Sequence, residues 1–221
     1  GADQMKIFNC TIRSSRTIKA ALGHGLAGIP AGFPDLFKAA DKLCLVTAAD
    51  APPSLRARAL ELFPEGKIPH FYFWLPPSEK AKTLEQAGKL CSYLFDKGFS
   101  RNSLIIAAGG GAVTDLAGFA ASIYMRGVNW ISVPTTFLGQ IDAGLGGKTA
   151  VNLGGAKNIA GTFHQPALAV CDTAFLDSLP HAELRSGGGE LVKYAMIGPG
   201  ALARTVKTHL SKTLAGDRSA L

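Results

Sequence analysis

Residues 104–115, with the sequence LIIAAGGGAVTD, constrain the fold more than any other part of this chain. The apolar, β-branched run at 104–108 favours a buried strand, and the three glycines after it end that strand. A helix-forming pattern follows and carries Asp115 one turn in. A strand that passes through a glycine turn into a helix leaves backbone N–H groups free beside the positive end of a helix dipole.

Such a turn predicts an anion or dinucleotide-phosphate site made by the backbone alone. Glycine lets a pyrophosphate approach the main chain because it has no Cβ. The segment departs from the strict G-x-G-x-x-G pattern, and a tight strand–helix turn without a ligand is the alternative interpretation.

The composition is that of an ordinary globular protein, with 47% hydrophobic and 18% charged residues among 221. The sequence holds 23 Lys and Arg against 16 Asp and Glu, which gives a net charge of +7. Nucleic acid would suit such a surface, but the sequence has no block of five like charges and no basic stripe with aromatic residues. Isolated basic residues in glycine-rich segments favour a pocket for a small anion instead, and no nucleic-acid partner is expected.

The sequence also indicates a cytoplasmic protein. Its N-terminus, GADQMKIF, lacks the basic and apolar segments of a signal peptide. The apolar stretch at 104–124 is not expected to cross a membrane, because three glycines and an aspartate interrupt it. No C-x-x-C pair occurs, and the scattered cysteines predict free thiols in a reducing compartment. These cysteines are Cys10, Cys44, Cys91 and Cys171.

Apolar runs alternate with helical periodicity from about residue 42 onward. This alternation, with fully apolar strands, predicts an α/β fold: a Rossmann-like parallel sheet with helices on both faces. Ligands of such sheets bind at the carboxyl ends of the strands. Strands are predicted at 43–47, 70–74, 104–108, 130–133 and 167–171, and helices at 54–63, 79–97 and 112–124. The less legible region before residue 40 suggests a helix at 20–28.

From residue 178 onward the pattern is all-helical. We therefore expect an α/β domain over 1–177, followed by the beginning of an all-helical C-terminal domain over 178–221. Within the second part, Glu190 and Lys193 stand three residues apart and thus on one helical face. The residues around them are apolar, which favours a pair that faces a cleft over a surface ion pair.

A second glycine-rich stretch, PTTFLGQIDAGLGGKTAVNLGGAKN at 134–158, combines backbone donors with point charges. Two lysines, an aspartate and a Thr-Thr pair after a strand end favour phosphate binding by these loops over an ordinary connector with solvated lysines. The polar residues of the stretch are Thr135, Thr136, Asp142, Lys148, Thr149, Lys157 and Asn158. The histidines show no metal-ligand spacing, and no Ser-His-Asp or Cys-His set is assembled in order.

Four segments together resemble one enzyme family. GGGAVTDLAGFAASIYMRG, VPTTFLGQIDAGLGGKTAVN, GGAKNIAGTFHQP and GELVKYAMI resemble 3-dehydroquinate synthase of the shikimate pathway, over a match from about residue 76 to 198. The resemblance implies a homodimer with an NAD-binding α/β domain, a helical C-terminal domain and an active site between them. It also implies NAD and a divalent metal (zinc or cobalt) as cofactors, and the sugar phosphate 3-deoxy-D-arabino-heptulosonate 7-phosphate as substrate.

The resemblance carries site roles to individual residues. It implies NAD contacts at Glu79, Lys82, Gly110, Gly111, Asp115, Thr135 and Thr136. It implies substrate contacts at Asp142, Lys148, Lys157, Asn158 and Lys193. Glu190 matches the carboxylate ligand of the metal, and Arg126 matches an arginine offered across the dimer to the substrate phosphate.

Two departures from the family pattern stand out. Ala48 occupies the position of an Asp or Asn that serves the adenine ribose, so either Asp50 substitutes for it or the contact is missing. The family's two metal-binding histidines lie beyond the residues of this sequence, and one ligand of three cannot build the metal site. We therefore expect the chain alone to be inactive.

Three alternatives stay open on the sequence alone. A sister sugar-phosphate cyclase that makes 2-deoxy-scyllo-inosose or a valiolone-type ring would share DAGLG, whereas GGKT and the Lys157-Asn158 pair favour the shikimate enzyme. A metal-dependent polyol dehydrogenase would share the fold and the triple-glycine turn but lack GGKT and the later E-x-x-K pair. The last alternative is a binding module without enzymatic activity.

Overall fold

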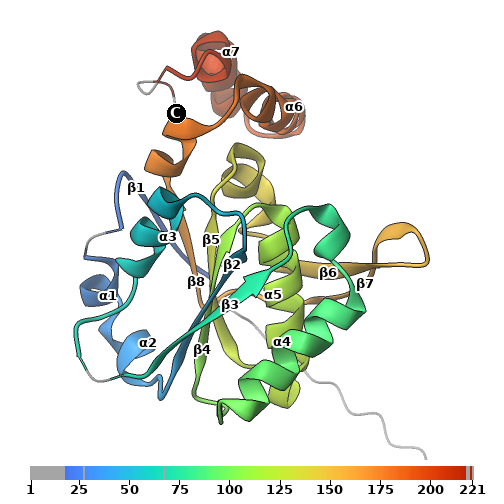
Figure 1. Cartoon of the computed structure of the whole chain (residues 1–221). Helices are drawn as coiled ribbons and strands as arrows, with labels where there is room; N and C mark the ends of the chain where they lie inside the picture. The colour runs from blue at the N-terminus through green and yellow to red at the C-terminus, as the bar shows by residue number, and fades with distance from the viewer. Residues whose placement is uncertain (1–17, 27, 67, 218–219, 221) are drawn as a thin grey trace, which may run out of the picture.

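The computed structural model describes residues 18–26, 28–66, 68–217 and 220, arranged as Figure 1 shows. Six strands form one parallel sheet in the order β1-β8-β5-β4-β2-β3, and two more form a separate antiparallel hairpin, β6-β7. The strands span Lys19–Gly23 (β1), Leu43–Ala48 (β2), His70–Leu75 (β3), Leu104–Gly109 (β4), Asn129–Pro134 (β5), Lys148–Leu153 (β6), Ala156–Phe163 (β7) and Leu168–Asp172 (β8).

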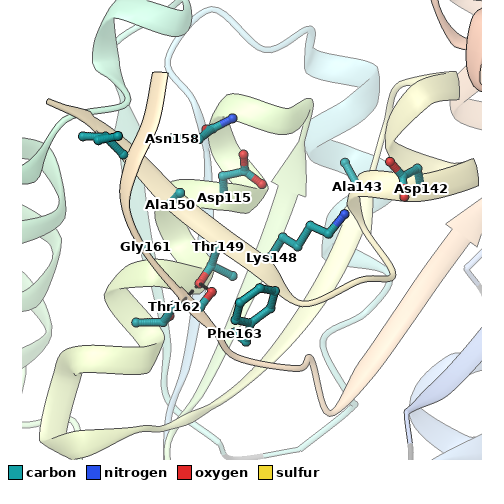
Figure 2. A pocket seen from close by; sticks show the side chains of 11 residues that line it. Asp115, Asp142, Ala143, Lys148, Thr149, Ala150, Asn158, Gly161, Thr162 and Phe163 are labelled. Atoms are coloured by element: carbon teal, nitrogen blue, oxygen red, sulfur yellow. Dashed lines mark hydrogen bonds between the residues drawn. The ribbon is translucent and has the colours of Figure 1, made fainter. Parts of the chain in front are cut away.

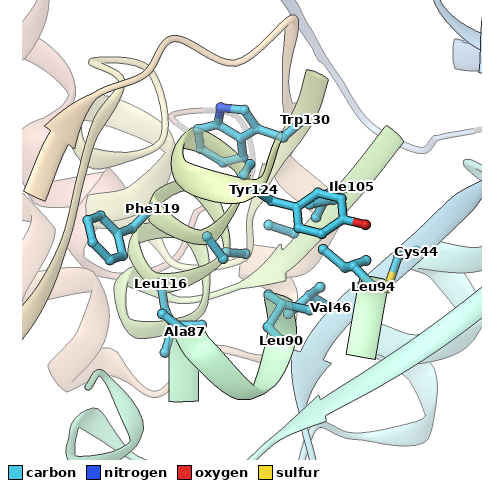
Figure 3. Close-up of a cluster of buried hydrophobic side chains, with 14 of the residues drawn as sticks. Cys44, Val46, Ala87, Leu90, Leu94, Ile105, Leu116, Phe119, Tyr124 and Trp130 are labelled. Atoms are coloured by element: carbon cyan, nitrogen blue, oxygen red, sulfur yellow. The ribbon is translucent and has the colours of Figure 1, made fainter. Parts of the chain in front are cut away.

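Helices cover both faces of the sheet, which confirms the predicted fold class. One face packs against α4 and α5 in a buried cluster that includes Leu90, Ile105 and Trp130 (Figure 3). The other face packs against α2 and α3 in a cluster with Phe37 and Ala59. The helices span Ile29–Gly32 (α1), Pro34–Lys38 (α2), Pro53–Leu60 (α3), Leu84–Asp96 (α4), Gly111–Ile123 (α5), His181–Ile197 (α6) and Gly200–Leu214 (α7).

Burial on two faces explains the continuous apolar runs. β4 and β8 are buried along their whole length. In β4, Ile105 faces the cluster with α4 and α5, whereas Leu104 and Ile106 face the opposite cluster, because successive side chains of a strand alternate. Full burial of each such side chain contributes about 1.5–3 kcal/mol. All five predicted strands are present, each within one residue of its predicted ends.

The predicted helix at 79–97 is wrong at its start. Residues Glu79–Ala81 form a 3₁₀ turn, η1, and Lys82 and Thr83 then leave the helical conformation before α4 begins at Leu84. The Thr83 hydroxyl accepts the Gln86 N–H at 3.2 Å and so caps α4. The break turns Lys82 into the interior of the protein, where its exposed fraction is 3%.

The suggested helix at 20–28 is also wrong, because Lys19–Gly23 is the edge strand β1. It pairs in parallel with β8, from Lys19 opposite Leu168 to Gly23 opposite Asp172. This pairing joins segments that lie far apart in the sequence, so the local pattern gives no indication of it. The short helices α1 and α2 follow, and the prediction for Cys10 lies outside the described residues.

The glycine-rich stretch at 134–158 is more ordered than the predicted loops. It begins with a π-helical turn, η3 at Gly139–Ala143, and continues into the hairpin β6-β7. Gly154 and Gly155 make the two-residue connection of this hairpin with φ of 59° and 81°. Two positive φ values in succession suit a tight hairpin turn and favour glycine. In Figure 1 the hairpin projects beside α5.

The C-terminal part is helical, as predicted, and begins after the 3₁₀ turn η4 at Thr173–Ser178. Helix α6 packs on η4 and on the segment after β5 through a small buried cluster of Phe137, Leu176 and Leu184. Gly187 makes this approach possible, since a Cβ there would lie 2.5 Å from the Phe137 ring. The three glycines before Glu190 thus lie inside α6, and Gly187 and Gly188 serve packing, whereas a Cβ at Gly189 would meet no atom within 4 Å.

The apolar stretch at 104–124 is strand β4 followed by α5, so it crosses no membrane as a single helix. Within the part of the chain that the structure describes, no helix has both the length and the apolar character required to span a bilayer.

Substitutions of two glycines test the packing of the hairpin on α5. A Cβ at Gly118 would lie 2.4 Å from Thr149 Cγ2 on β6 and 2.9 Å from the Trp130 ring, so Gly118→Ala should lower the free energy of unfolding by about 1–3 kcal/mol. The control is Gly88→Ala in α4, which meets no atom within 4 Å and should raise stability by about 0.5–1 kcal/mol. Urea unfolding of both variants measures the difference. Equal effects would contradict the proposed close packing.

Candidate functional site

The glycine turn after β4 forms a cradle at the carboxyl end of the sheet. Gly110 is the N-cap of α5, and no side chain caps its first N–H groups. A Cβ at Gly110 would lie 3.2 Å from Thr136 Cγ2, whereas a Cβ at Gly111 would meet no atom within 4 Å. Thr135 holds the turn from β5, since its N–H donates to the Gly109 carbonyl at 3.0 Å. The free amides of the helix start therefore face open space.

This open space is a cavity of about 260 Å³ between the ends of β2, β3 and β4. Glu79 is its acidic residue, Ser78 contributes a hydroxyl, and the other lining residues are apolar or glycine. The lining comprises Ala48, Leu75, Pro76, Ser78, Glu79, Ala81, Gly110, Gly111, Ala112 and Val113. A cavity beside free amides suits a phosphate-containing ligand.

A second cavity, of about 440 Å³, lies between α5, η3 and the hairpin (Figure 2). It brings together four of the predicted site residues: Asp115, Asp142, Lys148 and Asn158. Figure 2 shows the Lys148 side chain extending across the cavity toward Asp142. Among the described residues Lys148 forms no ion pair, so its charge is free to meet a ligand.

Lys82 lines neither cavity but holds two residues of the larger one in place from inside the protein. Its ammonium forms an ion pair with Asp115 and donates a hydrogen bond to the side-chain carbonyl of Asn158. The side chain of Lys82 is 4% exposed and that of Asp115 16%. Burial raises the pKa of Asp115, and the neighbouring Lys82 opposes this shift. The ion pair thus keeps a carboxylate available in a poorly solvated place.

Hydrogen bonds of Asn152 fix the hairpin to the η1 turn. The Asn152 side chain donates to Glu79 Oε1 at 3.0 Å and accepts the Asn158 N–H at 3.0 Å. The Asn152 backbone N–H donates to the Lys82 carbonyl at 2.7 Å. Asn152 was not among the predicted site residues, because an amide within a strand gives no motif by itself.

Thr149 is a buried residue that takes part in packing. It is 2% exposed, and its hydroxyl bonds the Thr162 carbonyl at 3.1 Å and the Thr162 hydroxyl at 2.8 Å. The Thr162 hydroxyl donates in turn to Ser122 on α5 at 2.8 Å. These bonds hold the hairpin against α5.

Tyr194 is a second residue that the sequence prediction missed. Its hydroxyl donates to Asp142 Oδ1 at 2.8 Å, which joins α6 to the π-helical turn η3. This hydrogen bond to Asp142 raises the pKa of Tyr194. Its position next to Lys193 in GELVKY was a possible indication, but a tyrosine in an apolar helix is more often a packing residue.

Glu190 and Lys193 lie on one face of α6, as predicted, and form an ion pair with each other. The hydrogen bond from Lys193 to Glu190 raises the pKa of Lys193. Half of the Lys193 side chain is exposed, and neither residue lines the two cavities described above. In the described part of the chain, no group of three His, Cys, Asp or Glu residues is placed to hold a metal. Glu190 alone does not fit a catalytic metal centre.

Two other predicted residues lie apart from both cavities. Lys157 is exposed on β7, and only its neighbour Asn158 reaches the larger cavity. Arg126 is exposed in the turn η2 with a φ of 65°, and it lines a separate pocket of about 420 Å³ with Asn129 and His164. The imidazole of His164 lies 3.0 Å from the Val128 carbonyl, so its ring orientation is set by the backbone.

A family model described as 3-dehydroquinate synthase N-terminal matches residues 72–186, more than half of the chain. The chain belongs to the 3-dehydroquinate synthase family. It is 41% identical over 180 residues to the 3-dehydroquinate synthase of Desulforamulus reducens, covering 81% of the chain and 50% of that relative. The chain spans about half the length of the curated relatives it matches.

Two solved structures share the fold. A 2-deoxy-scyllo-inosose synthase complexed with carbaglucose-6-phosphate, NAD+ and Co2+ is 31% identical, with a TM-score of 0.73 over 81% of this chain and 49% of that one. The 2-epi-5-epi-valiolone synthase of Streptomyces hygroscopicus, with NAD+ and Zn2+ bound, is 27% identical, with a TM-score of 0.81 over 94% and 57%. NAD and a divalent metal therefore occur in proteins similar to this chain.

The raised pKa of Asp115 leads to a prediction of how the stability of the fold depends on pH. Because the folded state holds the Asp115 proton more tightly than the unfolded state, this residue's contribution to stability should decline as the pH rises from below 3.8 through its folded pKa. Asp115→Asn lacks this titration. The free energy of unfolding of the wild type, relative to Asp115→Asn, should therefore fall between acidic and neutral pH. Urea unfolding at several pH values measures it, and a relative rise would contradict the dominance of burial over the Lys82 pair.

Proposed function

We propose that this chain is the cofactor-binding part of a 3-dehydroquinate synthase, which converts 3-deoxy-D-arabino-heptulosonate 7-phosphate to 3-dehydroquinate and phosphate. The observation that carries the proposal is the open space before Gly111, where uncapped amides of α5 face a 260 Å³ cavity. Backbone amides at a helix start are suited to the pyrophosphate of NAD. When bound, NAD would accept a hydride from a secondary alcohol of the substrate.

The larger cavity is proposed to hold the sugar phosphate. Lys148 offers a cation for a carboxylate or phosphate, and Asp142 offers an acceptor for hydroxyl groups. Both charges line one 440 Å³ space without pairing with each other. Such separated charges suit a ligand that carries both hydroxyls and an anion. Asn158, held by Lys82, adds a polar wall to this space.

A divalent metal belongs to the proposed whole enzyme, with zinc and cobalt as candidates. The residues described here provide Glu190 as one ligand and no complete set, so this part of the chain does not fit the metal by itself. Lys193 already pairs with Glu190, and this pair would have to rearrange when Glu190 binds a cation.

A homodimer and a cytoplasmic location are also part of this proposal. A homodimer would let the exposed Arg126 reach the substrate phosphate of a partner, since no acidic partner holds it among the described residues. A cytoplasmic location agrees with Cys44, Cys91 and Cys171 as free thiols. Burial raises the pKa of Cys44 to about 12 and that of Cys171 to about 11, so both are unreactive packing residues. We place the domain boundary near residue 177, before α6.

The sister cyclases are the second candidate function. The neighbour with 31% identity is a 2-deoxy-scyllo-inosose synthase, so the fold and the cofactor cavity do not separate the two. The match to the 3-dehydroquinate synthase family model and identities of 41–53% to curated members favour the first candidate.

NAD binding tests the glycine cradle directly. Calorimetric titration of the chain with NAD should show binding, and Gly111→Ala should weaken it by at least about tenfold, because a Cβ there enters the space of the phosphate. The fold should be unchanged, since that Cβ meets no protein atom within 4 Å. Gly189→Ala in α6, which also meets none, is the matched control. No heat with folded wild-type protein would disprove the site.

The chain alone should have no synthase activity. Catalytic zinc takes about three protein ligands, and the described residues offer Glu190 without a complete ligand set. The measurement is phosphate release from 3-deoxy-D-arabino-heptulosonate 7-phosphate with NAD and added zinc or cobalt. Turnover that a chelator abolishes would show that a complete metal site exists within this chain.

A further inference from the structure

The side chain of Gln140 joins the ends of two neighbouring strands. The residues that pair β5 with β8 end at Ser132 on β5, although β5 continues to Pro134 and β8 to Asp172. Beyond that point the Gln140 Nε2 donates to the Pro134 carbonyl at 3.1 Å and to the Asp172 carbonyl at 2.8 Å. Gln140 is 7% exposed, so both N–H groups of a buried amide are used. This amide therefore holds the two strand ends together where their own ladder has stopped.

Gln140 belongs to the π-helical turn η3, in which the Gly144 N–H donates to the Gly139 carbonyl at 2.8 Å. Turns of this kind are rare and occur frequently at functional sites. The turn packs closely on the end of β5, since a Cβ at Gly139 would lie 2.8 Å from Pro134 Cβ and one at Gly144 2.7 Å from Pro134 Cγ. The amide and the two glycines together fix the backbone of η3 to the sheet.

Asp142, two residues later in the same turn, points away from the sheet. Gln140 is directed into the protein, whereas Asp142 lines the larger cavity. Figure 2 shows Lys148 extending toward Asp142 from the hairpin. The Tyr194 hydroxyl, 2.8 Å from Asp142 Oδ1, holds the same carboxylate from α6. The position of the Asp142 carboxylate in the cavity thus follows from the position of the η3 backbone.

We propose that Gln140 is a positioning residue for ligand binding in the larger cavity. By fixing η3 to the ends of β5 and β8, it places the Asp142 carboxylate opposite the Lys148 ammonium, without contacting the ligand itself. The inference rests on the proposed function, because it assumes that the larger cavity takes the sugar phosphate. It adds a residue outside the cavity that determines how well the hydroxyl groups of that ligand are bound.

The test is calorimetric titration of the purified chain with the sugar phosphate of the proposed reaction and, separately, with NAD. Gln140→Met keeps the length of the side chain and removes both donors. It should weaken the sugar phosphate by at least about tenfold, because Asp142 moves with the released turn. NAD, which is proposed to bind in the smaller cavity, should change by less than about twofold. Gln86→Met makes the same change on α4, lines neither cavity and should alter neither affinity.

A double-mutant cycle separates positioning from a general structural effect. If Gln140 acts through Asp142, then Gln140→Met should weaken the sugar phosphate by no more than about twofold when Asp142→Asn is already present. A residue that only stabilises the fold would lower the affinity by the same factor in both backgrounds. Losses that multiply in the double variant would therefore overturn the inference.

A milder variant keeps the inference testable if Gln140→Met does not fold. Gln140→Asn retains the amide but is one methylene shorter, so it cannot reach both carbonyls from the same backbone position, and it should weaken the sugar phosphate by at least about threefold. Wild-type affinity in either folded variant would overturn the inference alone. Absence of sugar phosphate binding by the folded wild type would overturn the proposed role of the larger cavity, and this inference with it.

Discussion

The buried ammonium of Lys82 is the interaction on which the arrangement of the site depends. A lysine that is 3% exposed must be paired, since an isolated charge in such a place is very unfavourable. Its partners come from two other elements, Asp115 on α5 and Asn158 on the hairpin. Removal of one partner from such a pair typically costs about 3–5 kcal/mol. One side chain therefore fixes the η1 turn, the start of α5 and the hairpin relative to one another.

The packing of the hairpin and of α6 relies on glycines. Gly118 lets β6 approach α5, and Gly187 lets α6 approach Phe137. On the hairpin itself, a Cβ at Gly161 would lie 2.5 Å from the Thr149 carbonyl. Because these contacts are tight, the polar residues that the hairpin and α6 carry, such as Lys148 and Tyr194, are held in fixed positions.

The sequence predicted the central strands of the sheet well because β2, β4, β5 and β8 are buried on both faces. The run at 104–108 is too apolar for a surface helix or a loop, and the glycines that follow it indicate where the strand ends. β1 was missed because it is an edge strand whose pairing partner β8 lies far away in the chain. The hairpin was missed because β7 is mostly exposed and two glycines interrupt the pattern between the strands, so that tertiary contacts with α5 decide its conformation.

The site could be predicted where its chemistry resides in the backbone, and less well where it depends on side-chain partners. The glycine turn works through local geometry, which residues 104–115 specify among themselves. The roles of Asn152 and Tyr194 depend on Glu79 and Asp142, which lie far from them in the sequence. Helix α5 contributes residues to both cavities. Its first residue, Gly111, opens the smaller cavity, and Asp115 one turn later lines the larger one. Ligands in the two cavities would consequently contact neighbouring turns of one helix and lie next to each other.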